Sequence, residues 1–263
     1  MFNNDFMARK FNGNTWAIEG AGCCSYLVLG GQRAAMVDTG MSTLNLREYV
    51  RTITDLPAFV VNTHGHFDHT GGNGWFGDVY MHQEAVKDCR IPVFDARLED
   101  YPCGYEIKTV EEPYVFDLGG RHLEVIGIPA HNAGSIALLD HENRLLFSGD
   151  EIEAGQVLLI ALMAEAQSCQ TVEAHQRNMK RLRARIAEFD SICPSHNGTP
   201  IHNSYVDAFI GNAQRIMDGI EGTRKYQSPS FPVSNLPDEP FIRRSEFKGS
   251  SIVYDKRRIF SEG

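Results

Sequence analysis

The sequence predicts an α/β fold, in which helices pack against β-sheets. In the first part of the chain, short apolar runs of strand length alternate with stretches of helix-like spacing, and glycines or prolines separate them. A hairpin and two long helical stretches follow. This alternation favours helices lying on sheets. The chain has 263 residues, 42% of them hydrophobic, which is enough for one large core.

The first strands are short apolar runs bounded by turn residues. Gly30-Gly31 makes a turn before the third run, and Ser42 is placed to cap a helix that runs through Leu46 and Val50 and ends before Pro57. We expect strands at Thr15–Glu19, Ser25–Leu29, Ala34–Asp38, Phe59–Val61 and Val79–Met81, and a helical stretch at Gln83–Lys87.

The middle of the chain predicts a strand, then a hairpin, then helices. The tight connection His141–Arg144 joins the two strands of the hairpin. Val172, Met179, Leu182 and Ile186 have the spacing of one helix face. We expect strands at Leu123–Ile128, Ser135–Leu139, Leu145–Phe147 and Asp190–Cys193, and helices at Thr171–Phe189 and Tyr205–Ile220.

Proline punctuates the end of the chain. Four X-Pro pairs fall between residues 228 and 240, and proline removes a backbone donor and restricts the residue before it. We therefore divide the chain into a compact domain, residues 1–220, and a C-terminal arm, residues 221–263, which ends in an expected strand at Ser251–Tyr254. The arm packs on the same domain or on a partner subunit.

Charge and composition exclude some classes of function. The net charge of −9 argues against binding a nucleic-acid backbone, which needs a basic face. No apolar stretch is long enough to cross a bilayer, and the N-terminus lacks the basic start and apolar run of a secretory signal. We expect a cytoplasmic protein with a small-molecule substrate and no nucleic-acid or membrane partner, for which a homodimer is allowed.

The six cysteines do not predict a thiolate metal site, because none forms a C-x-x-C pair. Cys23 and Cys24 lie in a strand-like run and are expected to be small core residues in a reducing compartment. Cys193 is near His196 in sequence, and burial in a strand is the simpler interpretation for it.

The run His64-Gly65-His66-Phe67-Asp68-His69 is the strongest functional signal. It places four metal-capable side chains within six residues, directly after an apolar run. Three further residues of this type each follow an apolar run. The seven candidate metal ligands are His64, His66, Asp68, His69, His131, Asp150 and His196. Seven such groups are enough to bind two metal ions, which makes metal-assisted hydrolysis the leading hypothesis.

The spacing of the run suggests how the ligands divide. In an extended segment side chains alternate faces, so His64 and His66 point the same way and can share one metal. Asp68 and His69 lie where the chain turns and can face a second. One metal would take His64, His66 and His131, the other Asp68, His69 and His196, with Asp150 bridging them. Imidazole and carboxylate suit two Zn²⁺, and iron or manganese fits the same ligands.

The ordered motifs resemble the metallo-β-lactamase superfamily. The matching pieces are Thr63–His69, Pro129–His131, Phe147–Asp150, Pro194–His196 and, earlier, Val37–Gly40. The resemblance implies a four-layer αβ/βα sandwich of two mixed β-sheets with flanking helices, with the metals on loops at strand ends. Residues 1–220 would then be the catalytic domain. Histidine-asparagine at His131-Asn132 departs from the histidine-threonine that family members often have.

The ligand set separates branches of that superfamily. True lactamases usually lack a bridging aspartate at the position of Asp150, and the largest class has arginine where this chain has His69. Glyoxalase II and related thioesterases share the full set. Flavodiiron proteins have an acidic residue where this chain has His66, and an added flavin domain. The resemblance therefore favours zinc hydrolysis of a thioester over antibiotic hydrolysis or oxygen reduction.

The sequence thus predicts a dinuclear zinc-dependent hydrolase in which a metal-bridging hydroxide attacks an ester-like bond, a thioester first, then a lactone or phosphodiester. Asp68 is the expected catalytic residue, and Asp68→Ala should abolish turnover in a folded protein. The alternative is an iron-dependent oxidoreductase of the same fold, persulfide dioxygenase-like or diiron. A non-catalytic binding protein is the third hypothesis, which unchanged activity in His66→Ala would favour.

Residues outside the motifs carry weaker signals. Asp38 either holds a ligand histidine or caps a turn. The run Val157–Met163 lines a pocket, forms a dimer contact or is simply core. Two basic-aromatic clusters, around Tyr226 and Tyr254, bind a substrate anion or are solvated surface. The remaining histidines are expected at the surface or satisfied by partners: His82, His122, His141, His175 and His202, of which His202 is the one nearest the motif.

Overall fold

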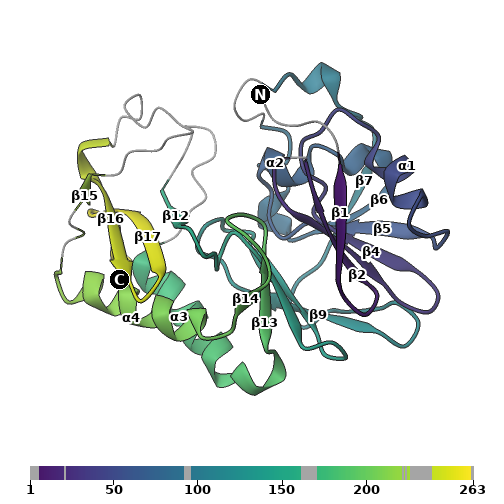
Figure 1. Cartoon of the computed structure of the whole chain (residues 1–263). Helices are drawn as coiled ribbons and strands as arrows, with labels where there is room; N and C mark the ends of the chain where they lie inside the picture. The colour runs from purple at the N-terminus through teal and green to yellow at the C-terminus, as the bar shows by residue number, and fades with distance from the viewer. Residues whose placement is uncertain are drawn as a thin grey trace. The chain divides into compact units, whose positions relative to one another are not determined.

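The computed structural model describes residues 6–20, 22–91, 96–160, 171–220, 222, 224–225 and 239–261. The chain forms two compact units (Figure 1). Unit 1 comprises Met1–Gly127 and Gly134–Gly149, and unit 2 comprises Ile128–Ala133 and Asp150–Gly263.

Unit 1 contains a seven-stranded mixed sheet whose strands lie in sequence order. Its first four strands pair antiparallel and its last four pair parallel. Parallel neighbours need a crossover, and α1 (Leu46–Arg51) supplies the one between the fourth and fifth strands. The strands are β1 (Met7–Asn12), β2 (Thr15–Glu19), β3 (Ser25–Leu29), β4 (Ala34–Val37), β5 (Ala58–Val61), β6 (Asp78–Met81) and β7 (Glu106–Thr109).

The parallel half of this sheet decides where polar residues gather. β4 and β5 run side by side in the same direction, with Val37 opposite Val61. The segments that follow the two strands therefore leave the sheet at the same edge. One segment begins with Asp38 and the other leads through Thr63 to the histidine run. Buried apolar side chains of the strands and α1 form the core beneath them: Ile18, Leu27, Met36, Val60, Val79, Leu46 and Val50.

A second group of strands in unit 1 is antiparallel throughout: β8 (Val115–Asp117), β9 (His122–Gly127), β10 (Ile136–Asp140) and β11 (Leu145–Gly149). Every residue of β10 and β11 is buried, so both faces of this hairpin are covered. Arg121 links the two groups of strands: its guanidinium pairs with Asp140 and donates to Thr15 Oγ1 at 2.6 Å and to the Leu29 carbonyl at 3.0 Å.

Unit 2 is built around α3 (Val172–Ala184) and α4 (Tyr205–Met217), which lie side by side (Figure 1). A four-stranded sheet has the order β12-β17-β16-β15, and β13 pairs with β14. Asn212 of α4 donates to the Ser245 and Ser250 carbonyls and so ties the helix to the β16–β17 hairpin. The strands are β12 (Val157–Leu159), β13 (Ser191–Pro194), β14 (Ile201–His202), β15 (Arg224–Lys225), β16 (Ile242–Phe247) and β17 (Ser250–Asp255).

The predicted α/β class is confirmed, and some local predictions are wrong. Asn45, and not Ser42, caps α1: its side chain accepts from Glu48 N at 3.1 Å, whereas Ser42 Oγ accepts from Leu44 N. The stretch Gln83–Lys87 holds only a 3₁₀ turn, Gln83–Ala85. The helix expected to reach Phe189 ends at Ala184, and a 3₁₀ turn, Ile186–Glu188, follows it. The remaining short helices of the described residues are α2 (Phe67–Thr70) and 3₁₀ turns at Asn73–Trp75, Leu98–Asp100 and Glu239–Phe241.

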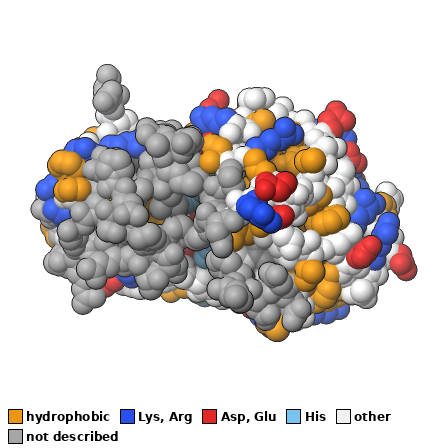
Figure 2. All heavy atoms as spheres, turned by 90° about the horizontal axis from the view of Figure 1, so that it is seen from above, with side chains coloured by type: hydrophobic (Ala, Val, Ile, Leu, Met, Phe, Trp, Pro, Cys, Tyr) orange, Lys and Arg blue, Asp and Glu red, His pale blue; other side chains and the backbone are white. Residues whose placement is uncertain are grey.

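The described surface of unit 1 carries both signs of charge. On the face in Figure 2, acidic and basic side chains lie interspersed among apolar ones over unit 1 and do not gather by sign. This view offers no single-sign basic face of the kind that a nucleic-acid backbone needs. Among the described residues, no helix combines the length and the apolar character needed to span a bilayer.

Candidate metal centre

The histidine run is held in a tight turn after β5. His66 is the residue before α2, so Phe67, Asp68 and His69 form the first turn of that short helix. Gly65 is required at its position, because an added Cβ would lie 2.1 Å from the Ala85 carbonyl oxygen. The turn stacks the imidazoles: the ring centroids of His64 and His69 are 4.0 Å apart, and those of His64 and His66 are 4.6 Å apart.

We call His64, His66, Asp68 and His69 the unit 1 ligand group. Candidate ligand atoms lie within 4.8 Å of each other in the pairs His64–His66, His64–His69 and Asp68–His69. His69 Nε2 is 3.7 Å from Asp68 Oδ2. Two atoms bound to a tetrahedral zinc ion at about 2.0–2.1 Å are roughly 3.4 Å apart. These separations therefore fit ligands of shared metal ions.

Asp38 fixes this group through hydrogen bonds to Thr63 and His69. Its Oδ1 accepts from Thr63 N at 2.8 Å, and its Oδ2 accepts from Thr63 Oγ1 at 2.7 Å and from His69 Nδ1 at 2.9 Å. Asp38 has a positive φ of 58°, which aspartate tolerates better than most residues. Of the two roles expected for Asp38, the structure shows the contact with a candidate ligand, His69.

The same contacts assign the protons of His64 and His69. A carboxylate only accepts, so the Asp38 contact places the proton of neutral His69 on Nδ1. Thr63 has one hydroxyl proton, which it donates to Asp38. Its oxygen, 3.2 Å from His64 Nδ1, therefore accepts a hydrogen bond from that nitrogen, which keeps the proton. In both histidines the lone pair is left on Nε2, the form that a metal binds.

A buried polar cluster fixes the backbone of the turn. The His69 carbonyl accepts from Thr39 N at 2.8 Å, Thr39 Oγ1 at 3.0 Å and Asn62 Nδ2 at 3.0 Å. Asn73 in turn bonds to both Thr39 and Asn62. Neither Asn62 nor Asn73 was predicted, although for Asn62 its place directly after a buried strand was a usable signal.

The unit 2 ligand group consists of His131, Asp150 and His196. Asp150 Oδ2 lies 3.6 Å from His131 Nε2 and 3.5 Å from His196 Nε2, again the separation of ligands on shared ions. His131 Nδ1 is 2.8 Å from the Leu158 carbonyl oxygen, which only accepts. His131 therefore also carries its proton on Nδ1 and presents Nε2.

This contact gives the apolar run Val157–Met163 a role. Its first three residues form β12, whose Leu158 carbonyl orients His131, while Val157 and Leu159 are buried. β12 is itself held by β17, in which Val253 lies opposite Leu158. The C-terminal hairpin thus supports the strand that orients a candidate ligand. Residues 161–163 lie outside the described residues.

Two buried residues next to this group were missed by sequence reasoning. Glu151 Oε1 accepts from Ala130 N at 2.9 Å and from His131 N at 2.7 Å. His175, expected at the surface or satisfied, is fully buried on α3, with Nδ1 3.6 Å from Glu151 Oε2. An acidic residue directly after a predicted ligand was the available signal for Glu151.

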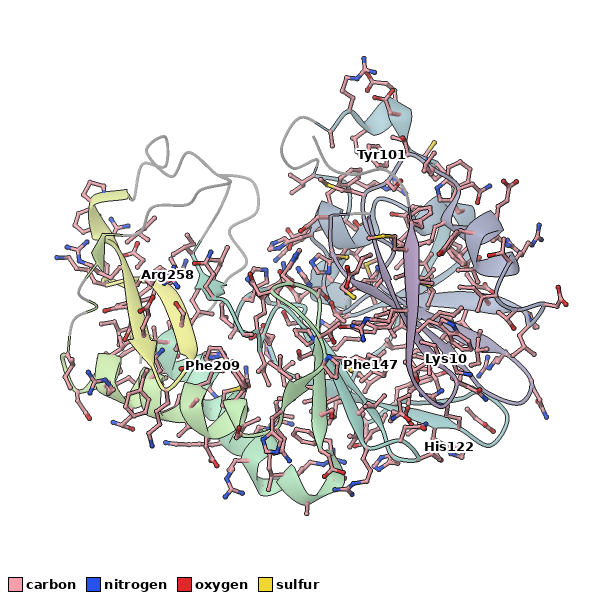
Figure 3. The ribbon with its side chains drawn as sticks, viewed as in Figure 1. Lys10, Tyr101, His122, Phe147, Phe209 and Arg258 are labelled. Carbon is pink, nitrogen blue, oxygen red and sulfur yellow. The ribbon has the colours of Figure 1, made fainter. Side chains whose placement is uncertain are left out.

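The other extra histidines have ordinary partners. His122 and His141 lie beside Glu142 and Glu124, and the hydrogen bond with Glu142 raises the pKa of His122. His82 and His202 each accept from a backbone N–H two residues ahead. Figure 3 labels His122 on β9.

Neither Cys23 nor Cys193 is a candidate metal ligand. Burial raises the pKa of Cys23 well above its ordinary value, so the thiol near Asp38 stays protonated. Cys193 is buried in β13, as expected. In the basic-aromatic cluster around Tyr254, Tyr254 is buried and accepts from Gly222 N, while Arg257 pairs with Asp255. Tyr226, of the other cluster, lies outside the described residues.

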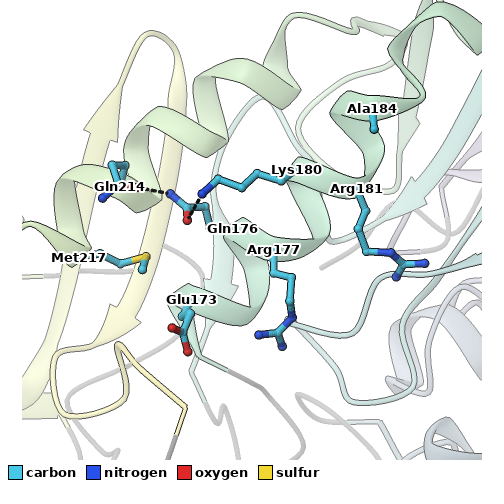
Figure 4. Close-up of a pocket in the computed structure, with 8 residues that line it drawn as sticks. All are labelled: Glu173, Gln176, Arg177, Lys180, Arg181, Ala184, Gln214 and Met217. Carbon is cyan, nitrogen blue, oxygen red and sulfur yellow. Dashed lines mark hydrogen bonds between the residues drawn. The ribbon is translucent and has the colours of Figure 1, made fainter.

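A groove of about 680 Å³ lies along the outer face of α3 (Figure 4). At 3.6 residues per turn, its lining residues on α3 are on the opposite side of the helix from His175 and Asn178. Asn178 donates to the Pro129 carbonyl, so that opposite side faces the His131 loop. The groove therefore does not contain the unit 2 ligand group. It is lined by Glu173, Gln176, Arg177, Lys180, Arg181, Ala184, Gln214 and Met217.

A mixed-sheet α/β chain with oriented imidazoles and carboxylates on loops at strand ends has the features of a metal-dependent protein. The chain belongs to the metallo-beta-lactamase superfamily, whose family model matches residues 19–218. That match confirms the predicted family and the predicted fold class, and it includes all seven candidate ligands.

Curated relatives share part of their length with this chain. It is 33% identical over 162 residues to "Acyl-coenzyme A thioesterase MBLAC2" of Gallus gallus, a match covering 51% of this chain and 58% of the relative. It is 28% identical over 200 residues to "Hydroxyacylglutathione hydrolase" of Methylococcus capsulatus, covering 70% of this chain and 68% of the relative. The chain thus spans less than two thirds of the length of the MBLAC2 protein.

Solved structures support the fold. The chain is similar to a metallo-beta-lactamase from Pontibacter korlensis with a TM-score of 0.60 and 19% identity, covering 79% of this chain and 98% of the other. The stereoselective inverting sec-alkylsulfatase Pisa1 from Pseudomonas sp. matches with a TM-score of 0.63 and 12% identity, covering 88% of this chain and 46% of the other. At these identities the likeness shows the fold alone.

Proposed function

We propose that this protein is a zinc-dependent hydrolase of thioesters that uses two metal ions. Membership of the metallo-beta-lactamase superfamily supports metal-dependent hydrolysis. The printed names of two relatives, an acyl-coenzyme A thioesterase and a hydroxyacylglutathione hydrolase, support a thioester as the bond that is cleaved. A lactone or a phosphodiester is the next class to test.

One observation carries the metal part of the proposal. In His64, His69 and His131, Nδ1 donates a hydrogen bond to a neighbouring oxygen, so each ring presents the lone pair of Nε2. A histidine that only fills space does not need its tautomer fixed. A ligand histidine does, because only the deprotonated nitrogen binds a metal. Neutral imidazole with carboxylate favours zinc, and iron or manganese fits the same donors.

Each residue then has a proposed role. His64, His66 and His131 would hold one ion, and Asp68, His69 and His196 would hold the other. Asp150, whose Oδ2 lies 3.6 Å from His131 Nε2 and 3.5 Å from His196 Nε2, would be the ligand that both sites share. When bound, two such ions would supply a hydroxide at neutral pH and polarise the carbonyl of the substrate. Asp68 is the proposed catalytic residue, since it is the one carboxylate of the unit 1 ligand group.

The thioester preference has a chemical reason. A thiolate leaves as an anion without needing a proton, because the pKa of a thiol is near 8.5. The chain therefore needs no separate acid to protonate the leaving group. The substrate is then a small molecule, and the compartment we propose is the cytoplasm. Five cysteines in the described part of the chain are free, which supports a reducing compartment.

Metal analysis beside a substrate panel tests the proposal. Purified protein should contain about two zinc ions per chain, as measured by mass spectrometry, and should hydrolyse acyl-coenzyme A or acylglutathione thioesters faster than lactones or phosphodiesters. Asp68→Ala should lose turnover while its circular dichroism spectrum stays unchanged. Iron with oxygen uptake and no hydrolysis would instead place the protein among iron-dependent oxidoreductases. Full activity in Asp68→Ala would refute the two-metal mechanism.

A further inference from the structure

A buried carboxylate holds the backbone of the His131 loop. Glu151 is 1% exposed, and its Oε1 accepts from two consecutive backbone donors, Ala130 N and His131 N. Burying a carboxylate is costly unless hydrogen bonds compensate it. Two backbone N–H groups converging on one oxygen provide part of that compensation and fix the direction of the peptide that carries His131.

The same loop is fixed from two other directions. Asn178 of α3 donates to the Pro129 carbonyl at 3.0 Å. The Leu158 carbonyl of β12 lies 2.8 Å from His131 Nδ1. Hydrogen bonds therefore fix the Pro129 carbonyl, the backbone N–H of His131 and the ring of His131. Each contact comes from a different segment of unit 2, so together they define both the position and the rotation of the imidazole.

The second oxygen of Glu151 has an unusual environment. Glu151 Oε2 lies 3.6 Å from Nδ1 of the fully buried His175, too far for a hydrogen bond. His175 packs edge-on against Phe209 of α4, labelled in Figure 3, with ring centroids 5.4 Å apart. In the described part of the chain, three atoms of this pair have no hydrogen-bond partner: Glu151 Oε2 and both ring nitrogens of His175.

Such a pair is poorly explained by folding alone. Breaking hydrogen bonds to water without replacing them destabilises the folded state, and an apolar pair of similar volume would fill the space at least as well. Buried polar groups left in this condition call for another explanation. Here that explanation is near at hand, because Asp150, a candidate ligand, is the residue immediately before Glu151.

We propose that Glu151, backed by His175, is a positioning residue that fixes two metal ligands relative to each other. Glu151 directly follows Asp150 in the chain, and its side chain accepts a hydrogen bond from the backbone N–H of His131. Asp150 Oδ2 and His131 Nε2 are held 3.6 Å apart by this link, the separation that a shared ion needs. The inference rests on the proposed metal-dependent function and adds residues to it.

The test measures metal binding and not only activity. Zinc affinity is measured by competition with a chromogenic chelator, and visible absorption of the cobalt(II)-substituted protein reports the geometry around the ion. Glu151→Ala should lose about 10- to 100-fold in zinc affinity, as is typical when a partner of a ligand is removed, and should change the cobalt spectrum. Glu151→Gln should restore most of the affinity, because its amide oxygen can accept the same two N–H groups.

Gln176→Ala is the matched control. Gln176 is buried on the same helix as His175 and bonds to Gln214 at 2.9 Å and to the Ile210 carbonyl, but it contacts neither ligand loop by a hydrogen bond in the described part. This variant should lose stability and keep its zinc affinity and spectrum. If Glu151→Ala does not fold, Asn178→Ala removes the neighbouring anchor, and its zinc affinity should fall as well.

Several results would overturn the inference. Unchanged zinc affinity and an unchanged cobalt spectrum in folded Glu151→Ala, or in Asn178→Ala where that variant replaces it, would do so. So would an equal loss in Gln176→Ala, or a Glu151→Gln protein as weak as Glu151→Ala. If the wild-type chain binds metal and hydrolyses thioesters, and Glu151→Ala has the same zinc affinity and cobalt spectrum, only the positioning role is overturned. A wild-type chain that binds no metal overturns the proposed function with it.

Discussion

Asp38 is the residue whose substitution tests the metal centre of unit 1 most directly. Asp38→Asn keeps the shape of the side chain and suits the positive φ of 58°, since asparagine also tolerates the left-handed region. Its remaining oxygen can still accept from Thr63 N. The new NH₂ group, however, faces two donors, the hydroxyl of Thr63 and the Nδ1–H of His69.

The expected loss can be worked out from these contacts. A hydrogen bond to a charged acceptor contributes about 1.5–3 kcal/mol, and Asp38 makes one such bond to a ligand histidine. If that stabilisation is lost from the form of His69 that binds metal, affinity should fall by roughly 10- to 150-fold, at about 1.4 kcal/mol per factor of ten. The thermal shift produced by zinc should shrink in proportion.

A control separates metal affinity from stability. Asp140 is equally buried and pairs with Arg121, and breaking a buried ion pair costs about 3–5 kcal/mol. It lies at the opposite end of β10 from Ile136, whose N–H bonds to Thr63 O beside the histidine run. Asp140→Asn should therefore destabilise the chain more than Asp38→Asn and leave zinc affinity unchanged. Unaltered affinity in Asp38→Asn, or equal losses in both variants, would refute the reasoning.

Three further predictions concern other parts of the molecule. Cys23 is buried, and burial raises the pKa of its thiol, so at pH 8 a thiol reagent should label exposed Cys103 and spare Cys23 until urea unfolds the chain. Peptide mapping that finds rapid labelling of Cys23 in the folded chain would contradict this burial. Truncation before β17 removes the strand that pairs with β12. The truncated chain should lose most of its zinc-induced thermal shift, because the Leu158 carbonyl no longer fixes His131. A truncated protein that keeps the full shift would contradict this role of β17. Arg177 lines the groove on the outer face of α3, and Arg177→Ala should leave kcat/KM for thioesters within about twofold of the wild-type value. The control Arg183→Ala, on the same helix, should behave in the same way. A tenfold fall in Arg177→Ala alone would place part of the substrate in that groove.

Local sequence predicted the parts of the site that local geometry determines. The run His64–His69 signals its chemistry because three histidines and an aspartate within six residues have few structural uses, and the structure brings all four side chains together in unit 1. The strands before Asp38 and before the run were also predicted, since β4 and β5 are short, apolar and bounded by turn residues. Asp38 was identified for the same reason, at the end of its strand.

The residues that sequence reasoning missed depend on contacts between distant segments. Glu151 and His175 are 24 positions apart, and nothing in either local pattern indicates that α3 brings one beside the other. The cap of α1 was misassigned because Ser42 and Asn45 are both good capping residues, and only the turn before Leu46 decides between them. The end of α3 was misplaced because apolar spacing continues through Ile186 after the helix has ended.

The strongest physical argument for a metal centre is that different acceptors produce the same tautomer. A threonine hydroxyl serves His64, a carboxylate serves His69 and a backbone carbonyl serves His131. Asp38 links the first two, because it accepts from both Thr63 and His69, whereas the Leu158 carbonyl belongs to a separate strand. Metal binding explains all three, because each contact leaves Nε2 as the basic nitrogen. In the metal-free protein, ¹⁵N chemical shifts should therefore report Nδ1–H for these three rings, and a majority of Nε2–H among them would remove the basis for the ligand assignment.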